Sequence, residues 1–471
     1  MKRVAVIGGG IGGMTAAGEL ARAGHAVTLF ERGSRLGGKA HAISRDGVKL
    51  DTGPTLLTLP HVVRETFGRL GAEDLLPRLI ELPLQCEYRF ADGARFRAHR
   101  DLEAAAVSAE TLRAGEGARL RAFYAAAEEI YRAAGEPYLE APVEGTLEYV
   151  LRVARRGVHA VWKGARLGTL AGLAEQHFAT PHLQQFVGRF ATYAGASPYR
   201  ASAAFALIPH LERAFGVHHV EGGMGALSAA LGTALARLGV AVKLGAPATW
   251  QRWGDGFAAG PEGGQEKFDA VVVNADPLAS LGRAGEPLAL SGYVLLLECA
   301  RLPLPHHTIT FARDYRAELD ALFEGRVPDD LTFYVCHPAA SDPTMAPEGK
   351  SGLFVMLNAP PLDERDDWSA LGARLRERCL AHVRELGATE VKVVAERTPV
   401  DLARTGAPRG SIYGFLPHGR LGPFRRPRIR SRTPGLFYSG GGTHPGGGVP
   451  LVMLSGRFAA ELAGRHLGAR A

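Results

Sequence analysis

The sequence predicts an α/β fold: a three-layer dinucleotide-binding domain joined to a second domain of sheet and helices. Two observations indicate the first domain. The apolar run Val4 to Ile7 leads through a glycine-rich turn into a helical pattern, and a second strand–glycine turn–helix unit stands near the carboxyl end. A third observation, several strand patterns separated by helical ones between these units, indicates the second domain. At 471 residues the chain is long enough for two cores.

The amino-terminal unit has the residues that a dinucleotide requires. Gly8, Gly10 and Gly13 form G-x-G-x-x-G between the strand and a helix over 15–23, and a second strand over 26–30 ends at Glu31. The first glycine permits the tight turn, the second lets the backbone approach a pyrophosphate, and the third lets the helix pack on the strand. The helix N-terminus faces the phosphates and the acid accepts from the ribose hydroxyls.

The triplet alone is a weak signal in a chain with 60 glycines, where a purely structural turn is the alternative, so its context carries the prediction. The cofactor-binding residues predicted from this unit are Gly8, Gly10, Ile11, Gly12, Gly13, Glu31 and Arg32.

Two segments after Glu31 indicate which dinucleotide binds. Arg35 to Lys39 reads R-L-G-G-K, and Asp51 to Leu56 reads D-T-G-P-T-L after a predicted hairpin over 43–50. Both resemble the FAD-binding amino-terminus of the amine oxidase and phytoene desaturase superfamily, where the first runs past the pyrophosphate and the second lies alongside the flavin. From the residues alone, the second is a capped turn before a helix. The resemblance implies FAD contacts from Gly38, Lys39, Gly53, Pro54, Thr55 and Leu56.

Bulk properties exclude several classes of partner. The net charge of +7 comes mostly from arginine, but no aromatic residues are interleaved with a basic groove pattern, so nucleic acid is not expected. The four cysteines are scattered, with neither metal-site spacing nor a disulfide framework. No apolar run has the length of a membrane span, and the first strand begins at Val4, so we expect a cytoplasmic protein without a signal peptide whose membrane contact is peripheral.

The second domain is predicted to begin with strands over 86–90 and 94–99, followed by a helical region over 102–134. A helix over 146–178 then carries a basic stripe and an opposite apolar face. A basic amphipathic helix suits an anionic membrane surface, whereas a solvated arginine face on a packed helix is the alternative, and the pattern leaves both open. The basic stripe is Arg152, Arg155, Arg156, His159, Lys163 and Arg166, and the apolar face is Leu147, Leu151, Ala154, Val158, Val161 and Trp162.

Motifs in the middle of the chain extend the resemblance. Arg189 to Arg200 (R-F-A-T-Y-A-G-A-S-P-Y-R) and Glu221 to Leu227 are similar to the hydroxycarotenoid 3,4-desaturase branch of the family. After a strand over 240–244, the family places a backbone contact to adenine at Ala248. A buried strand over 268–273 ends in N-A-D-P, which implies a further cofactor contact at Asn274.

The second domain resumes at Ser291, with strands over 291–299, 308–311, 331–337, 353–357 and 391–395 and a helix over 364–386. The proline-rich loop over 337–349 resembles carotenoid desaturases, although a proline-rich hairpin is the alternative. The pair His306-His307 lacks carboxylates at fixed spacing, so we interpret both as loop histidines and predict no metal site. The arginines over 420–432 are interpreted as a solvated loop rather than a headgroup patch.

The carboxyl-terminal unit has a strand over 436–439, the segment G-G-G-T-H-P-G-G-G-V-P and a helix over 451–467. Such a turn presents N–H groups at a helix N-terminus. It resembles the 3,4-desaturase branch, which implies that Gly441, Gly442, Gly448 and Val449 meet the ribityl chain and isoalloxazine. With no cysteine here, the FAD is expected to be non-covalent. His444 is the single candidate for a catalytic group, and structural hydrogen bonding in the turn is its alternative.

The resemblance spans nearly the whole chain and implies a discontinuous FAD domain of residues 1–80, 221–290 and 395–471. Residues 81–220 and 291–394 then form a substrate- and membrane-facing domain. The implied activity is FAD-dependent desaturation of an apolar carotenoid at C-3,4, with a 1-hydroxylated acyclic substrate. Hydride passes to the flavin and a proton to a weak base or water, and oxygen or a quinone accepts the electrons.

The implied location is the inner face of the membrane, by peripheral association. Three alternatives remain: a phytoene desaturase, an amine oxidase, and a non-catalytic lipid carrier on the same fold.

Overall fold

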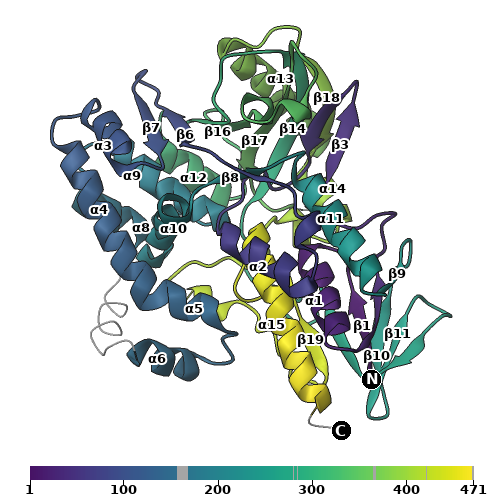
Figure 1. Cartoon of the computed structure of the whole chain (residues 1–471). Coiled ribbons are helices and arrows are strands. Elements are labelled where there is room, and N and C mark those ends of the chain that lie inside the picture. The colour runs from purple at the N-terminus through teal and green to yellow at the C-terminus, as the bar shows by residue number, and fades with distance from the viewer. Residues whose placement is uncertain (156–167, 279, 284, 364–366, 421, 469–471) are drawn as a thin grey trace.

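The computed structural model describes residues 1–155, 168–278, 280–283, 285–363, 367–420 and 422–468 (Figure 1). A five-stranded parallel sheet lies at the centre of one half of the molecule, with β1 between β13 and β2. Its β-branched residues are buried on both faces, as the sequence predicts. In spatial order the strands are β19 (Leu436–Tyr438), β13 (Ala270–Val273), β1 (Arg3–Ile7), β2 (Ala26–Phe30) and β9 (Ala241–Lys243).

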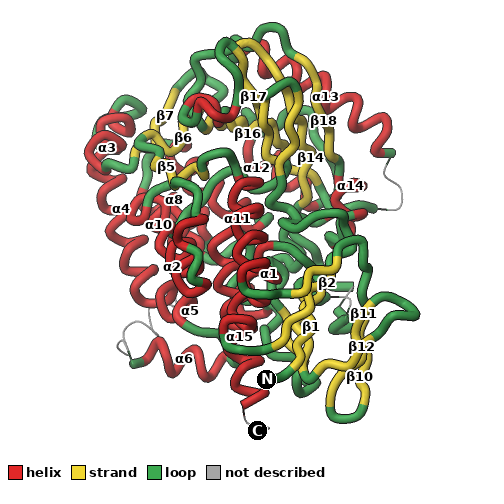
Figure 2. Tube along the Cα trace, turned by 45° about the vertical axis from the view of Figure 1, so that its right-hand side comes forward, coloured by secondary structure: helices red, strands yellow, loops and turns green. Residues whose placement is uncertain are grey.

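The sheet is covered on both faces, which makes three layers (Figure 2). Val4 and Val6 face a helical layer, whereas Ala5 faces a small antiparallel sheet through Phe257 and Phe268. The helical layer is α1 (Ile11–Arg22), α2 (Pro60–Leu70), α11 (Met224–Arg237) and α15 (Val449–Gly468). The small sheet is β10 (Thr249–Trp253), β11 (Gly256–Gly260) and β12 (Glu266–Phe268).

A seven-stranded mixed sheet forms the second half of the molecule. One face packs on α13 (Trp368–Glu385), and the hairpin of β3 (Ala42–Arg45) and β4 (Val48–Asp51) reaches the opposite face through Val48 and Leu50. In spatial order its strands are β18 (Lys392–Arg397), β14 (Ser291–Ala300), β17 (Lys350–Ala359), β16 (Phe333–Cys336), β15 (His307–Thr310), β6 (Leu84–Arg89) and β7 (Arg95–His99).

Helices gather beside the β6–β7 end of this sheet around an aromatic core that includes Tyr88 and Phe186 (Figure 1). They are α3 (Leu102–Glu110), α4 (Glu116–Ile130), α8 (Leu170–His177), α9 (Pro181–Gly188), α10 (Leu207–Phe215) and α12 (Tyr315–Phe323). The remaining α-helices and strands are α5 (Glu136–Glu140), α6 (Thr146–Ala154), α14 (Pro399–Arg404) and the ladder of β5 (Leu79–Glu81) with β8 (His218–Val220).

The helical region over 102–134 is two helices rather than one. Asp101 is the N-cap of α3, because its side chain accepts from the Ala104 N–H, and the helix ends at Glu110. Gly115 stands before α4 with φ of +86°, a left-handed conformation that suits glycine and reverses the chain direction. This break was not predicted, because the alanine-rich composition favours a helix on both sides of it.

The predicted basic helix over 146–178 is only partly described, as α6 and α8. Arg156, His159, Lys163, Arg166 and the apolar Val158, Val161 and Trp162 lie outside the described residues. A solvated role is wrong for Arg152, whose guanidinium donates to the carbonyls of Pro137, Ala141 and Pro142. The outer side of α6 instead exposes Leu147, Val150 and Leu151, at 72, 37 and 55% of their surface.

None of the described helices is long and apolar enough to cross a membrane. All four cysteines are free thiols, and each is buried.

A close backbone contact joins α1 and α15. A Cβ on Gly456 would lie 2.2 Å from the Gly12 carbonyl oxygen, whereas a Cβ on Gly464 in the same helix would meet nothing within 4 Å. Replacing Gly456→Ala should therefore separate the helices and lower the free energy of unfolding by about 1–3 kcal/mol. Gly464→Ala should keep or raise it, by up to about 1 kcal/mol, because alanine favours the helix.

Denaturant unfolding of both variants checks this expectation. Equal stability of the two variants would show that the contact between α1 and α15 does not limit the packing.

Candidate functional site

A single cavity of about 1640 Å³ connects the two halves of the molecule. It exceeds the roughly 300–1,000 Å³ typical of a small-molecule pocket, so it has room for a cofactor and a second ligand. One end is lined by the loops that follow β1, β2, β4 and β19. The other is lined by side chains of the mixed sheet and its helices, among them Val294, Ile309, Phe354 and Met356.

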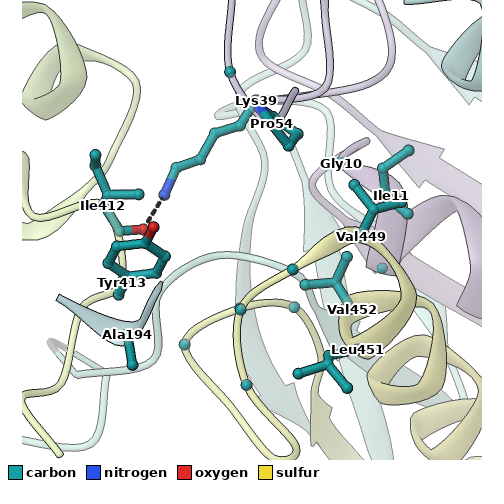
Figure 3. Close-up of a pocket in the computed structure, with 18 of the residues that line it drawn as sticks. Gly10, Ile11, Lys39, Pro54, Ala194, Ile412, Tyr413, Val449, Leu451 and Val452 are labelled. Carbon is teal, nitrogen blue, oxygen red and sulfur yellow. Dashed lines mark hydrogen bonds between the residues drawn. The ribbon is translucent and has the colours of Figure 1, made fainter. Parts of the chain in front are cut away.

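The cavity brings together the residues predicted to bind the cofactor, with the exception of Gly13. Figure 3 shows Gly10 and Ile11 at the start of α1 beside Val449 and Val452 of α15, with Pro54 and Lys39 across from them. Gly13 is in the contact between helix and strand, since a Cβ there would lie 2.0 Å from the Gly8 carbonyl oxygen. The predicted residues in the lining are Gly8, Gly10, Ile11, Gly12, Glu31, Arg32, Gly38, Lys39, Gly53, Pro54, Thr55, Leu56, Ala248, Asn274, Gly441, Gly442, Gly448 and Val449.

The start of α1 is shaped for a pyrophosphate. Gly10 is its N-cap, no side chain caps the helix, and its first turn has no acidic residue. The N–H groups and the positive end of the helix dipole are therefore available to an anion. A Cβ on Gly10 would lie 2.9 Å from Asn274 Nδ2, so only a glycine leaves the backbone open here. These features fit the phosphates of FAD.

Asn274 and Glu31 hold this loop in shape. Asn274 Nδ2 donates to the Gly8 carbonyl oxygen and its Oδ1 accepts from the Ser439 hydroxyl. The Glu31 carboxylate accepts from the Gly9 and Gly33 N–H groups, at 2.7 Å each. Because a carboxylate oxygen has two acceptor positions, Glu31 keeps capacity for ribose hydroxyls.

Lys39 crosses the cavity, and its Nζ donates to the Ile412 carbonyl oxygen at 2.6 Å (Figure 3). Burial lowers the pKa of Lys39, while the Asp276 charge acts in the opposite direction. Burial also raises the pKa of Asp276, whose carboxylate accepts from the Leu278 N–H. Asp276 lines the cavity but was not among the predicted site residues, although it belongs to the N-A-D-P segment.

Asp51 connects the loop over residues 52–56 with helix α11. Its Oδ1 accepts from the Met224 N–H at 2.8 Å, and thus caps a helix whose own N-cap residue is a glycine. Burial raises its pKa to about 7, although the backbone N–H groups favour the ionised form.

His444 does not reach the cavity lining. Its ring is buried 4.4 Å from the Tyr138 ring centroid and stacks on Phe458, and burial lowers the pKa of His444 to about 3. A neutral, packed imidazole fits the structural alternative better than a catalytic role. The next residue, Pro445, does line the cavity.

The arginine-rich segment over 420–432 is not uniformly solvated, so that prediction is wrong for Arg426. Its side chain is buried, lines the cavity and donates to the Gly441 carbonyl oxygen at 2.7 Å. Arg425 and Arg430 instead pair with Glu286 and Glu144 at the surface.

A polar wall of the cavity was missed as a site, although part of it lies in the R-F-A-T-Y motif. Arg189 and Tyr193 line the cavity beside Tyr334. The Tyr334 hydroxyl is 2.6 Å from Thr55 Oγ1 and 2.9 Å from His307 Nδ1, so the wall connects to the predicted flavin segment.

His306 and His307 are buried. His307 begins β15, so its interpretation as a loop histidine is wrong, whereas His306 lies in the loop before that strand. Their ring nitrogens and the Cys336 thiol lie within 4.8 Å of one another. Burial raises the pKa of the Cys336 thiol and lowers that of both imidazoles, which keeps all three groups neutral. Among the residues that the structure describes, no carboxylate belongs to this cluster, and the absence of a metal site stays a prediction.

Glu31 provides a test of the loop geometry. Glu31→Gln should weaken flavin binding about 10- to 100-fold, because the amide supplies one acceptor oxygen and directs N–H groups at a backbone donor. The control, Glu266→Gln, removes a half-exposed partner of Arg3 and should leave binding unchanged. Flavin retained after dialysis, measured by absorbance, checks both, and equal retention would rule out an organising role for Glu31.

Comparisons with known proteins agree with this site. Residues 11–463 match the family of flavin containing amine oxidoreductases. The chain is 34% identical to a hydroxyneurosporene desaturase of Cereibacter sphaeroides, over 98% of this chain and 97% of that protein. It is 32% identical to a zeta-carotene-forming phytoene desaturase of Myxococcus xanthus (98% and 93%) and 28% identical to a 1-hydroxycarotenoid 3,4-desaturase of a Flavobacterium species (98% and 99%).

Among solved structures, an engineered putrescine oxidase aligns with a TM-score of 0.66 at 17% identity, over 100% of this chain and 99% of that one. Cyclohexylamine oxidase from Brevibacterium oxydans aligns with a TM-score of 0.65 at 17% identity, over 99% of each chain. At such identity these neighbours show the fold alone, an α/β architecture, and the flavin follows from the family match. Together with the family match and the sequence relatives, they show that this chain is an FAD-dependent oxidoreductase of the flavin-containing amine oxidoreductase family and belongs to its carotenoid desaturases.

Proposed function

We propose that this protein introduces a C-3,4 double bond into an acyclic, 1-hydroxylated carotenoid, with FAD as the non-covalent oxidant. The observation that carries the proposal is the single cavity, in which a glycine-lined cofactor cradle continues into a pocket with an apolar lining. A long polyene in that pocket would lie against the cofactor. Two of the relatives are named for desaturation of hydroxylated carotenoids.

Bound FAD supplies the hydride acceptor, and the residues of this chain position the substrate and exclude water. Val294, Ile309 and Met356 present apolar surface to the polyene. Within the described lining the acidic side chains are Glu31 and Asp276, and Glu31 holds two backbone N–H groups. Asp276 accepts from the Leu278 N–H and faces the charge of Lys39. Neither carboxylate is assigned as the base, and the proton is proposed to leave to a weak base or water.

One of the two alternatives has support of its own, and the other does not. A phytoene desaturase would use the same cavity at other carbons, and one relative bears that name. A non-catalytic lipid carrier would have no need of the flavin contacts, yet the glycine cradle, Glu31 and the turn before α15 all line the cavity.

We also propose the domain limits inferred from the sequence, 1–80, 221–290 and 395–471 for FAD and 81–220 and 291–394 for the substrate. In support, each of the first three segments contributes to the parallel sheet. Oxygen or a quinone is proposed as the electron acceptor.

The proposed location of the protein is the inner face of the membrane, where α6 makes the peripheral contact with the lipid. Val150 lines the cavity and is also 37% exposed, so α6 forms a wall between the substrate pocket and the outer surface. Leu147 and Leu151 expose their side chains beside it. An apolar substrate could pass from lipid to the pocket at this wall without crossing water.

Substrate conversion tests the reaction. The protein is produced in a carotenoid-free bacterium that makes either phytoene or 1-hydroxylated acyclic carotenes, and the pigments are analysed by absorption and mass. Loss of two hydrogens with a red shift, only from the hydroxylated substrate, is expected. Colour formed directly from phytoene would favour the phytoene desaturase, and a purified protein without a flavin spectrum would favour the carrier.

Membrane contact is tested by removing the apolar surface of α6. The double variant Leu147→Ser/Leu151→Ser should sediment less with anionic phospholipid vesicles, because less apolar surface enters the lipid. The control, Val107→Ser, changes an equally exposed apolar residue on α3, at 68%, and should sediment as the unchanged protein does. Equal sedimentation of all three proteins would place the contact elsewhere.

A further inference from the structure

The positively charged guanidinium of Arg189 lies inside the cavity. It begins the short 3₁₀ turn Arg189–Ala194 after α9, and it lines the cavity together with Thr192 and Tyr193. Its guanidinium carbon lies 4.7 Å from the ring centroid of Tyr193. The rings of Tyr88, Phe190 and Tyr334 surround it at 5.9 Å each, so aromatic side chains lie around the charge where it does not face the cavity.

This cation has no carboxylate partner in the part of the chain that the structure describes. Glu212 is the acid whose charge acts on it, but the Glu212 carboxylate accepts from the Tyr193 hydroxyl instead. The side-chain hydrogen bond of Arg189 goes to Tyr193. A guanidinium has five N–H donors in a fixed plane, so most of its donors remain available to an acceptor inside the cavity.

Arg189 lies close to the cofactor end of the cavity. The Tyr334 ring is in contact with the guanidinium, and its hydroxyl is 2.6 Å from Thr55 Oγ1 in the segment that follows β4. One tyrosine therefore separates Arg189 from the wall on which the cofactor is proposed to lie. An oxygen atom that reached Arg189 would belong to a part of the substrate near the reacting carbons, not to its far end.

We propose that Arg189 forms a binding site for an oxygen substituent of the substrate, a hydroxyl group on a carbon within a few bonds of the C–C bond that is oxidised. The inference rests on the proposed function, in which the carbon that carries the hydroxyl, C-1, is separated from C-3 by C-2 alone. The hydroxyl oxygen accepts from the guanidinium, which fixes the position of the chain along the cofactor.

A substrate without the hydroxyl leaves the guanidinium donors unsatisfied in an apolar pocket, which is the arrangement by which buried polar groups reject an analogue. Arg189 acts by positioning rather than by catalysis. Departure of hydride leaves positive charge on carbon, and a neighbouring guanidinium does not favour that charge.

The test compares two substrates in the holoenzyme: a 1-hydroxylated acyclic carotene and the same carotene without the hydroxyl. Arg189→Met should lower kcat/KM for the hydroxylated carotene about 10- to 100-fold and leave the value for the parent carotene unchanged or higher. Arg189→Lys should restore part of the preference, because an ammonium still donates.

Arg316→Met is the matched control. It removes a guanidinium that lies 4.7 Å from the Tyr199 ring centroid on the outer surface, with 67% of the side chain exposed. We expect no change for either substrate.

The dissociation constants of both carotenes, measured by quenching of flavin fluorescence, provide a second readout that does not require turnover. Equal losses for the two substrates in Arg189→Met, with the flavin retained, would overturn the site. If Arg189→Met does not fold, the wild-type affinities decide: tighter binding of the hydroxylated carotene that Arg189→Lys reduces supports the site, and equal affinities overturn it. Failure of the proposed function is distinct, because the wild type would then not convert the hydroxylated carotene.

Discussion

The close approach of backbone segments around the start of α1 is the constraint on which the rest of the structure depends. The loop from Gly8, the first turn of α1 and the facing surface of α15 meet with no room for a side chain, since a Cβ on Gly13 or Gly456 would lie 2.0 or 2.2 Å from a carbonyl oxygen. This contact brings the two ends of the chain together. It also leaves the N-terminal N–H groups of α1 directed at the cavity, because glycine and the Asn274 amide, not a capping side chain, surround them.

The second feature of the molecule is the way it places charge inside a largely apolar cavity. Lys39, Arg189 and Arg426 line one continuous space, and they are held in two ways. Lys39 and Arg426 donate to backbone carbonyl oxygens on the cofactor side, whereas Arg189 lies among aromatic rings on the substrate side. Charged groups in a low dielectric are costly unless they have partners. The positions of these three side chains therefore mark where polar parts of a ligand would bind, and the remaining walls are largely apolar.

Much of the fold and part of the site could be predicted from the sequence. Strand–turn–helix units have local signals, so the parallel strands, α1, α15 and the glycine positions were predicted within a few residues. The break at Gly115 was not predicted, because alanine-rich segments on both sides favour helix. The solvated position of Arg152, one of the two alternatives left open, is wrong for a related reason. Helical periodicity gives the face on which a residue lies, but not which carbonyl groups a neighbouring turn brings against that face.

The sequence by itself determined the kind of cofactor and the family chemistry, because the contacts that bind a dinucleotide come from short, contiguous segments whose residue types are dictated by backbone geometry. Only the tertiary structure decided what surrounds the substrate. The wall of Arg189, Tyr193, Tyr334 and Thr55 joins three distant parts of the chain, and the exclusion of His444 from the cavity follows from its packing against Tyr138 and Phe458. Whether a polar side chain is solvated, paired or left open in a cavity depends on those non-local contacts, and no local pattern in the sequence records them.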